Sequence, residues 1–301
     1  MSAPALPPLD AADPLAAWML AEALTLLSQG RRPVFALNGP VGAGKSSLAR
    51  ALQAVFSAAG MELAVASIDD AYLPAAPRRV AMAGNPFGVS RVPPGSHDPE
   101  ALLTALDRWR AQPFSAEGSR RAPLELPRFD KTLLAGEGDR TMPWRGTADV
   151  VLLEGWMLGC VAQPELDLLQ HPRLRPPSEL DRDWLLRCNR ALAAYEPLWA
   201  QIDRWLMLWP TSWTLPRRWR FQAEARQRRS GGGWLPPKRL QALVEATLQS
   251  LPPAVYLEPL LDRVDWVRLL DGRRRCRWQG SGDAWRTLND QASSPCSSAT
   301  G

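Results

Sequence analysis

Residues 34–50 read V-F-A-L-N-G-P-V-G-A-G-K-S-S-L-A-R, and positions 39–46 match the phosphate-binding pattern G-x-x-x-x-G-K-[ST]. A short apolar run at 34–37 precedes the loop, and an amphipathic helical pattern runs from Lys45 towards Phe56. Phosphate binding requires this order of strand, loop and helix, because the N-terminus of the helix must face the anion. We therefore predict a nucleotide-binding loop and disfavour the alternative, a tight turn that binds nothing.

The composition of this loop suggests how it would hold ATP. Its glycines let successive backbone N–H groups point inward and form a concave anion site. Lys45 would then reach the β- and γ-phosphates, and the hydroxyl of Ser46 would bind Mg²⁺. We assign the nucleotide contacts to Gly39, Pro40, Val41, Gly42, Ala43, Gly44, Lys45, Ser46 and Ser47.

The overall composition limits the other possibilities. The chain has 301 residues, of which 46% are hydrophobic and 22% charged, as in a globular protein. No apolar run would cross a bilayer and no signal-peptide core is present, so we expect no membrane association and a cytoplasmic location. The net charge of +5 suits nucleic acid, but no nucleic-acid-binding motif accompanies it, and clustered arginines suit a nucleotide's phosphates equally well. The four cysteines are widely spaced, which predicts neither a disulfide framework nor a zinc site.

Acidic residues end two further apolar runs. Residues 62–70 read E-L-A-V-A-S-I-D-D, and a run at 149–153 is followed by Glu154. Parallel strands deliver such carboxylates to the edge of the sheet where the phosphate loop lies. If Asp69 and Asp70 lie on an extended strand they face opposite sides, so at most one points into the cleft. Glu154 is the expected Mg²⁺ partner, directly or through water.

The remaining segments complete an α/β fold. Apolar runs at 205–209 and 266–270 predict buried strands, and 14–27 predicts an amphipathic helix. The fold class is therefore α/β, a mainly parallel sheet flanked by helices, of the P-loop NTPase type. Residues 74–99 are rich in Pro, Gly and Arg, and His97 within them is either a turn residue or a ligand. The basic segment 215–229, followed by three glycines, is either a solvated helix or an arginine lid that closes over a nucleotide.

Taken together, these motifs resemble the D-glycerate 3-kinase family, P-loop kinases related to uridine kinase, phosphoribulokinase and bacterial pantothenate kinase. The resemblance covers about residues 31–270. The matching blocks are G-P-V-G-A-G-K-S-S-L-A (39–49), S-I-D-D-A-Y-L (67–73), R-V-P-P-G-S-H-D (91–98), P-R-F-D-K (127–131), G-E-G-D-R (136–140), E-G-W-M-L-G (154–159) and the lid segment that begins W-R-F-Q-A-E at 219.

The resemblance implies roles for individual residues. Asp69 would be the general base and, with Lys45, a catalytic residue, while Ser46 and Glu154 would hold Mg²⁺. Arg220 and Arg226 would be lid residues that contact ATP. The implied substrate contacts are Asp69, Tyr72, Arg91, His97, Asp98, Asp130 and Lys131.

The resemblance also implies a reaction, transfer of the γ-phosphoryl group of ATP to D-glycerate to give 3-phosphoglycerate. Alternatives are a related kinase acting on a pantothenate- or sugar-like alcohol, and a P-loop regulatory NTPase. The chain departs from the family pattern at Ala71, Val92 and Glu137, where an aromatic residue, a glycine and an arginine are usual, and Glu137 puts the acceptor in doubt. The expected domains are an N-terminal helical extension (1–30), a kinase domain (31–279, with its lid at about 213–236) and a disordered tail (280–301).

Overall fold

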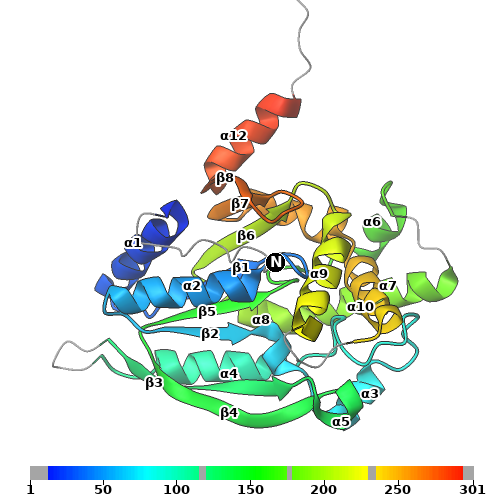
Figure 1. Ribbon diagram of the computed structural model, residues 1–301, viewed down its shortest axis with the longest axis horizontal. Coiled ribbons are helices and arrows are strands. Elements are labelled where there is room, and N and C mark those ends of the chain that lie inside the picture. The colour runs from blue at the N-terminus through cyan, green and yellow to red at the C-terminus, as the bar shows by residue number, and fades with distance from the viewer. Residues whose placement is uncertain (1–12, 115–119, 175–177, 230–234, 294–301) are drawn as a thin grey trace, which may run out of the picture.

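A computed structural model describes residues 13–114, 120–174, 178–229 and 235–293 of the chain. Its main feature is a six-stranded sheet in the order β2-β5-β1-β6-β7-β8, in which the first five strands are parallel and β8 is antiparallel (Figure 1). The predicted α/β class is confirmed. The strands are β1 (Val34–Asn38), β2 (Leu63–Ser67), β5 (Val150–Gly155), β6 (Arg204–Pro210), β7 (Trp266–Leu270) and β8 (Cys276–Ser281).

Helices cover both faces of this sheet, and the alternation of side chains along β1 explains why. Phe35 and Leu37 pack in one buried cluster, which also contains residues of α1 (Pro14–Ser28), α2 (Lys45–Ala58) and α9 (Leu215–Arg229). Val34 and Ala36 point to the opposite face. There they pack in a second cluster with residues of α4 (Pro99–Arg110), α7 (Glu179–Ala191), η2 (Leu192–Tyr195) and α8 (Glu196–Trp199).

The segment between β2 and β5 forms a layer beside the edge of the sheet. It contains η1 (Ile68–Ala71), α3 (Ala75–Ala81), α4, and a two-stranded antiparallel sheet of β3 (Ala122–Asp130) and β4 (Asp139–Ala148), with α5 (Leu133–Gly136) between the strands (Figure 1). Alternating residues of β3 are buried, as in a strand with one face on the core, and the register shifts between Leu126 and Arg128 around Pro127. The sequence pattern does not predict this hairpin.

The C-terminal part corrects one expectation. Residues 280–293 are not a disordered tail, because β8 extends to Ser281 and α12 (Gly282–Ser293) follows it. Trp278 and Trp285 explain the difference: their rings lie 5.5 Å apart, and both pack against the core. Residues 294–301 lie outside the described part of the chain. The other elements are α6 (Glu165–Gln170), α10 (Pro237–Ser250), α11 (Pro253–Tyr256) and η3 (Glu258–Asp262).

In the described ranges, no helix combines the length and the apolar character needed to span a membrane. The predicted N-terminal helix is present as α1, and Leu15 and Met19 on it are buried against the β1 face that carries Phe35. This helix is therefore packed into the core.

Candidate active site

The predicted phosphate loop lies between β1 and α2. Gly42 and Gly44 adopt positive φ values of 74° and 99°, which side chains disfavour. A Cβ atom at Gly42 would lie 2.6 Å from the backbone nitrogen of Arg220, so this glycine also allows α9 to approach the loop. Lys45 folds over the loop and donates to the carbonyl oxygens of Gly39 at 2.8 Å and Pro40 at 3.1 Å. Burial lowers the pKa of Lys45 from 10.5, an effect that Glu154 and Asp69 oppose.

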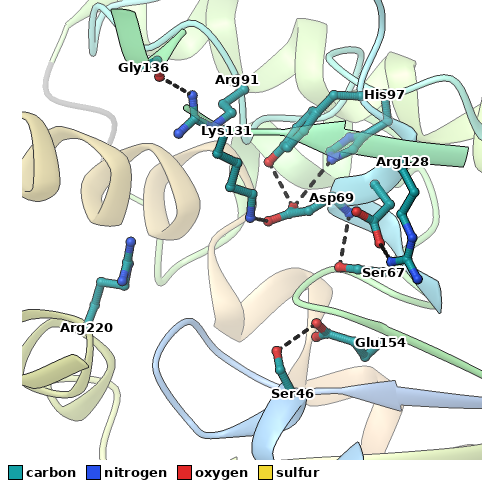
Figure 2. A network of polar contacts seen from close by, with 12 residues as sticks. Ser46, Ser67, Asp69, Arg91, His97, Arg128, Lys131, Gly136, Glu154 and Arg220 are labelled. Atoms are coloured by element: carbon teal, nitrogen blue, oxygen red, sulfur yellow. Dashed lines mark hydrogen bonds and ion pairs between the residues drawn. The ribbon is translucent and has the colours of Figure 1, made fainter. Parts of the chain in front are cut away.

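The two residues predicted to hold Mg²⁺, Ser46 and Glu154, lie in contact. Leu37 of β1 pairs with Glu154 of β5, which brings the carboxylate beside the loop, and the Ser46 hydroxyl donates to Glu154 Oε1 at 3.0 Å (Figure 2). No cluster of three metal-ligating His, Cys, Asp or Glu side chains occurs among the described residues. One hydroxyl and one buried carboxylate nevertheless fit Mg²⁺, which usually takes few protein ligands and completes its shell with phosphate and water oxygens.

The acidic pair after β2 lies on a 3-10 turn, η1, and not on an extended strand as expected. The Ser67 hydroxyl accepts from the Asp69 N–H at 3.3 Å and so caps the turn. Asp70 pairs with Arg128 at 2.8 Å, whereas Asp69 faces Lys131. Asp69 is therefore the carboxylate that lies towards the loop (Figure 2).

Three side chains surround the carboxylate of Asp69. The Tyr72 hydroxyl donates to Oδ1 at 2.8 Å, Lys131 Nζ donates to Oδ2 at 2.6 Å, and His97 Nε2 lies 3.9 Å from Oδ1. Burial is the largest effect on the pKa of Asp69 and raises it, but Lys131 and His97 together outweigh burial and hold this pKa well below 3.8. The carboxylate is therefore ionised at neutral pH and can accept a hydrogen bond from a hydroxyl group.

The other predicted substrate residues contact groups other than the carboxylate of Asp69. Arg91 is buried beside Lys131 and donates to the carbonyl oxygens of Gly136 and Glu137 at 2.8 and 2.9 Å (Figure 2). Asp98 caps α4 by accepting from the Ala101 N–H at 3.2 Å. Asp130 accepts from the backbone and hydroxyl of Thr132 within its own turn. The network around Asp69 thus contains Tyr72, His97 and Lys131. Asp98 instead caps α4 and pairs with Arg140 at 3.1 Å, and Asp130 binds within its own turn.

The three residues that differ from the family pattern have these contacts and backbone conformations in the structure. Ala71 is fully buried, and its carbonyl oxygen accepts from the Asp98 N–H at 2.7 Å. Val92 has a φ of 98°, a conformation that a glycine adopts without strain. Glu137 forms a two-pronged ion pair with Arg79 at 2.9 and 2.7 Å. Glu137 therefore has its own basic partner.

The predicted lid helix, α9, is anchored at its N-terminal end. Trp219 is fully buried in the core, and its indole N–H donates to the Gly272 carbonyl oxygen at 3.1 Å. Arg220 is half-buried and pairs with the buried Glu224 at 3.0 Å, while Arg226 is exposed. The glycines at 231–233 lie outside the described residues. A lid movement that carried Arg220 away from the loop would therefore have to pull Trp219 out of the core.

Arg274 is a residue of the site that the sequence analysis did not single out. It lies in the turn between β7 and β8 with a φ of 62°, and it donates to the carbonyl oxygens of Gly42 at 2.7 Å and Trp219 at 2.8 Å. Its guanidinium joins the phosphate loop to the lid helix. The sequence shows only a cluster of arginines at 273–277, and nothing in that cluster distinguishes the one that turns inward.

The fold and the site together are those of the P-loop kinase class, with a phosphate loop, a strand-end carboxylate beside it and a second carboxylate, that of Asp69, on the facing side. Solved structures have the same fold: a D-glycerate 3-kinase from Cryptococcus neoformans has a TM-score of 0.71 at 23% identity, covering 89% of this chain and 99% of that one. The YGR205w protein has a TM-score of 0.68 at 20% identity, covering 89% and 97%. No family model matches the chain.

Sequence relatives identify the family. The kinase mug58 of Schizosaccharomyces pombe, itself uncharacterised, is 31% identical over 206 residues, which are 65% of this chain and 71% of that protein. The chloroplastic D-glycerate 3-kinase of Arabidopsis thaliana is 30% identical over 237 residues, 75% of this chain and 49% of that protein. The chain therefore belongs to the family of P-loop kinases that contains these two proteins, and it spans about half the length of the Arabidopsis relative.

Proposed function

We propose that the protein is a D-glycerate 3-kinase, which transfers the γ-phosphoryl group of ATP to a hydroxyl group of D-glycerate and releases 3-phosphoglycerate. The observation that carries this proposal is the position of Asp69, whose carboxylate accepts from Tyr72 and Lys131 on the side that faces the phosphate loop. The relatives named as D-glycerate 3-kinases support the choice of acceptor.

The nucleotide side of the reaction would rest on the loop. The backbone N–H groups of residues 39–46 and the Lys45 ammonium would bind the phosphates. Ser46 and Glu154, already in contact at 3.0 Å, would hold Mg²⁺. When bound, this ion would neutralise charge on the β- and γ-phosphates. Arg220 and Arg226 on α9 would add positive charge from the lid side. Arg220 lies in the anchored part of the helix, and Arg226 lies in its exposed part.

The acceptor side would rest on Asp69. Its carboxylate would accept a hydrogen bond from the attacking hydroxyl group and take the proton as the new P–O bond forms and the bond from the γ-phosphorus to ADP, the leaving group, breaks. Because its pKa is held well below 3.8, Asp69 is a weak base. It suits a reaction in which the proton leaves late and orientation contributes most of the rate. Lys131 and Arg91 would attract the carboxylate of glycerate, and Asp98 and Asp130 would contribute through the loops they stabilise.

An acceptor panel tests this function. ATP consumption is measured with D-glycerate, L-glycerate, pantothenate and simple sugars, and the phosphorylated carbon of each product is identified by ³¹P and ¹³C NMR. D-Glycerate should stimulate turnover most and give the 3-phosphate. Phosphorylation of another alcohol instead would reject the acceptor, and slow hydrolysis that no acceptor stimulates would favour a regulatory NTPase. DNA, RNA and lipid vesicles should have no effect.

Substitution of Asp69 tests the mechanism. Asp69→Asn should lower kcat by about 10²- to 10⁴-fold, the usual contribution of a positioned general base. Lys45→Ala should abolish turnover, and both variants should keep the circular dichroism spectrum of the parent protein. Near-normal activity in Asp69→Asn would refute the role of Asp69. The cytoplasmic location expected from the sequence stays a prediction.

A further inference from the structure

The side chain of His97 is buried and held between two aromatic rings. Tyr72 stacks on it with ring centroids 4.4 Å apart and an interplanar angle of 19°, and Tyr195 meets it edge-on at 5.9 Å. His97 and Tyr72 also form an isolated β-bridge, so their backbones are fixed relative to each other. Because the imidazole cannot turn freely, each of its nitrogens keeps one set of neighbours.

The neighbours of Nδ1 determine which nitrogen carries the proton. The hydroxyl oxygen of Tyr195 lies 3.0 Å from Nδ1 and accepts from the Gly95 N–H at 3.1 Å. The Ser96 hydroxyl, 3.4 Å from Nδ1, donates its own proton to the Pro93 carbonyl oxygen at 2.6 Å. If Nδ1 were protonated, the buried hydroxyl of Tyr195 would receive two N–H groups and its own proton would have no acceptor among the described residues. The arrangement is satisfied when Tyr195 donates to Nδ1, which leaves the proton of the neutral ring on Nε2.

The Nε2 atom of His97 lies on the side of Asp69. It is 3.9 Å from Asp69 Oδ1, too far for a hydrogen bond, and Oδ1 already accepts from Tyr72. Within the described part of the chain, Nε2 is buried and has no hydrogen-bond partner. A buried N–H group without a partner costs about 1–3 kcal/mol, so one placed beside the proposed base calls for an explanation. The carboxylate of Asp69 is the acceptor that faces this atom, and a small movement of that side chain would close the 3.9 Å gap.

We propose that Tyr195 is a positioning residue that fixes His97 in its Nε2–H form, so that His97 presents an N–H donor to Asp69 and helps to orient its carboxylate for the acceptor. This inference rests on the proposed kinase function, and it adds a residue, Tyr195, that lies in a different part of the chain from the acceptor loop. The charge state agrees with it, because burial lowers the pKa of His97 below 6.5 against the opposing effect of Asp69, and the ring stays neutral.

The tautomer can be observed directly, without activity. The chain contains only two histidines, so the full-length protein labelled with ¹⁵N-histidine gives two ring systems in a long-range ¹H–¹⁵N spectrum, and His171→Gln assigns them. At about pH 8, where the ring is neutral, His97 should show a protonated Nε2 and a bare Nδ1. Tyr195→Phe should lose this preference. A protonated Nδ1 in the parent protein, or an unchanged tautomer in Tyr195→Phe, would overturn the proposal.

Kinetics then test the consequence. Tyr195→Phe should raise the KM of the acceptor about tenfold and leave the KM of ATP within about twofold, as expected for the loss of one well-placed hydrogen bond. Tyr256→Phe is the matched control, because it also removes a buried hydroxyl, one that donates to Asn189 at 2.8 Å away from Asp69. An equal rise of the acceptor KM in Tyr256→Phe would show a merely structural effect and reject the role of Tyr195.

Repeating the Tyr195 substitution in a His97→Gln protein separates the orientation of the His97 ring from its packing. In His97→Gln the side-chain amide supplies N–H donors without a tautomer, so Tyr195→Phe should add no further increase in the acceptor KM. An additive increase there would also count against the proposal. These comparisons use whichever alcohol the acceptor panel identifies. Failure of D-glycerate as a substrate would therefore reject the proposed function and leave the test of Tyr195 intact.

Discussion

The contact between the lid helix and the phosphate loop predicts a paired effect of Trp219→Phe on stability and nucleotide binding. Phenylalanine keeps most of the ring but leaves unfilled volume in a fully buried site, at a cost of about 1 kcal/mol. It also removes the 3.1 Å hydrogen bond to the Gly272 carbonyl oxygen, which contributes about 1 kcal/mol. The free energy of unfolding should therefore fall by about 2 kcal/mol. If about 1 kcal/mol of this loss weakens the contact between the phosphate loop and α9, the KM of ATP should rise about fivefold.

Urea unfolding followed by circular dichroism measures the first effect, and initial rates at varied ATP measure the second. Trp109→Phe is the matched control, since Trp109 is also buried and donates to a carbonyl oxygen, that of Ala148 at 3.2 Å, in the other core cluster. It should lose similar stability with an unchanged KM of ATP. If both variants raised that KM equally, or if Trp219→Phe destabilised the protein without changing it, the anchored-lid interpretation would be refuted.

Three further predictions concern metal, lid and pH. Glu154→Gln should raise the Mg²⁺ concentration needed for half-maximal rate by about tenfold or more, as measured by a Mg²⁺ titration at fixed ATP, whereas the exposed Glu125→Gln should not. Arg274→Lys, which cannot hold the Gly42 and Trp219 carbonyl oxygens with one planar group, should raise the KM of ATP severalfold, whereas its exposed neighbour Arg273→Lys should leave it unchanged. Because burial lowers the pKa of His97 below its ordinary 6.5, the unfolded chain takes up a proton that the folded protein does not as the pH falls below 6.5. The free energy of unfolding should therefore fall towards acid pH by up to about 1.4 kcal/mol per pH unit. Urea unfolding at each pH should show that His97→Gln lacks this contribution to the slope. Identical slopes in the variant and the parent protein would contradict the assignment of the effect to His97.

Parts of the fold and site that depend on short stretches of sequence could be predicted. The phosphate loop is one such stretch, and the strands β1, β5, β6 and β7 appear as apolar runs. All residues of β1 and β5 are buried, as are most of those of β6. Glu154 could be placed because it ends one of these runs and parallel strands end at the same edge. The choice of Asp69 over Asp70 came from the family resemblance, because the strand pattern left the two open.

Features that depend on distant partners could not be predicted. The β3–β4 hairpin contains a proline at its register shift and two glycines in its connection, which hide its alternating pattern. Asp69 and Asp70 lie on a 3-10 turn because Ser67 caps it, and their separation depends on Lys131 and Arg128, which lie about sixty positions further along the chain. The helix α12 is polar in sequence and packs through a tryptophan that meets β8.

The arginines explain why composition alone was ambiguous about partners. An excess of basic residues with a net charge of +5 suggests a polyanionic ligand. Several arginines instead bind the protein's own backbone: Arg32 donates to the carbonyl oxygens of Arg120, Gln112 and Pro113, and Arg78 to those of Ser90, Leu73, Glu137 and Gly138. A planar group with five donors can satisfy loop carbonyls that lie in no helix or sheet, which a lysine cannot do with the same geometry.

Arg78 shows what this arrangement does for the site. Its guanidinium is fully buried over the ring of Phe129, 4.8 Å from the centroid, and it joins the segment after Tyr72, the loop before Arg91 and the turn at Glu137. These are the irregular segments that surround Asp69 and carry most of the predicted acceptor contacts. Such segments have few backbone hydrogen bonds of their own, so their shape depends on side chains that reach across them. The basic residues of the acceptor region therefore act first as supports for its loops, and positive charge offered to a substrate is confined to the few, such as Lys131, that face Asp69.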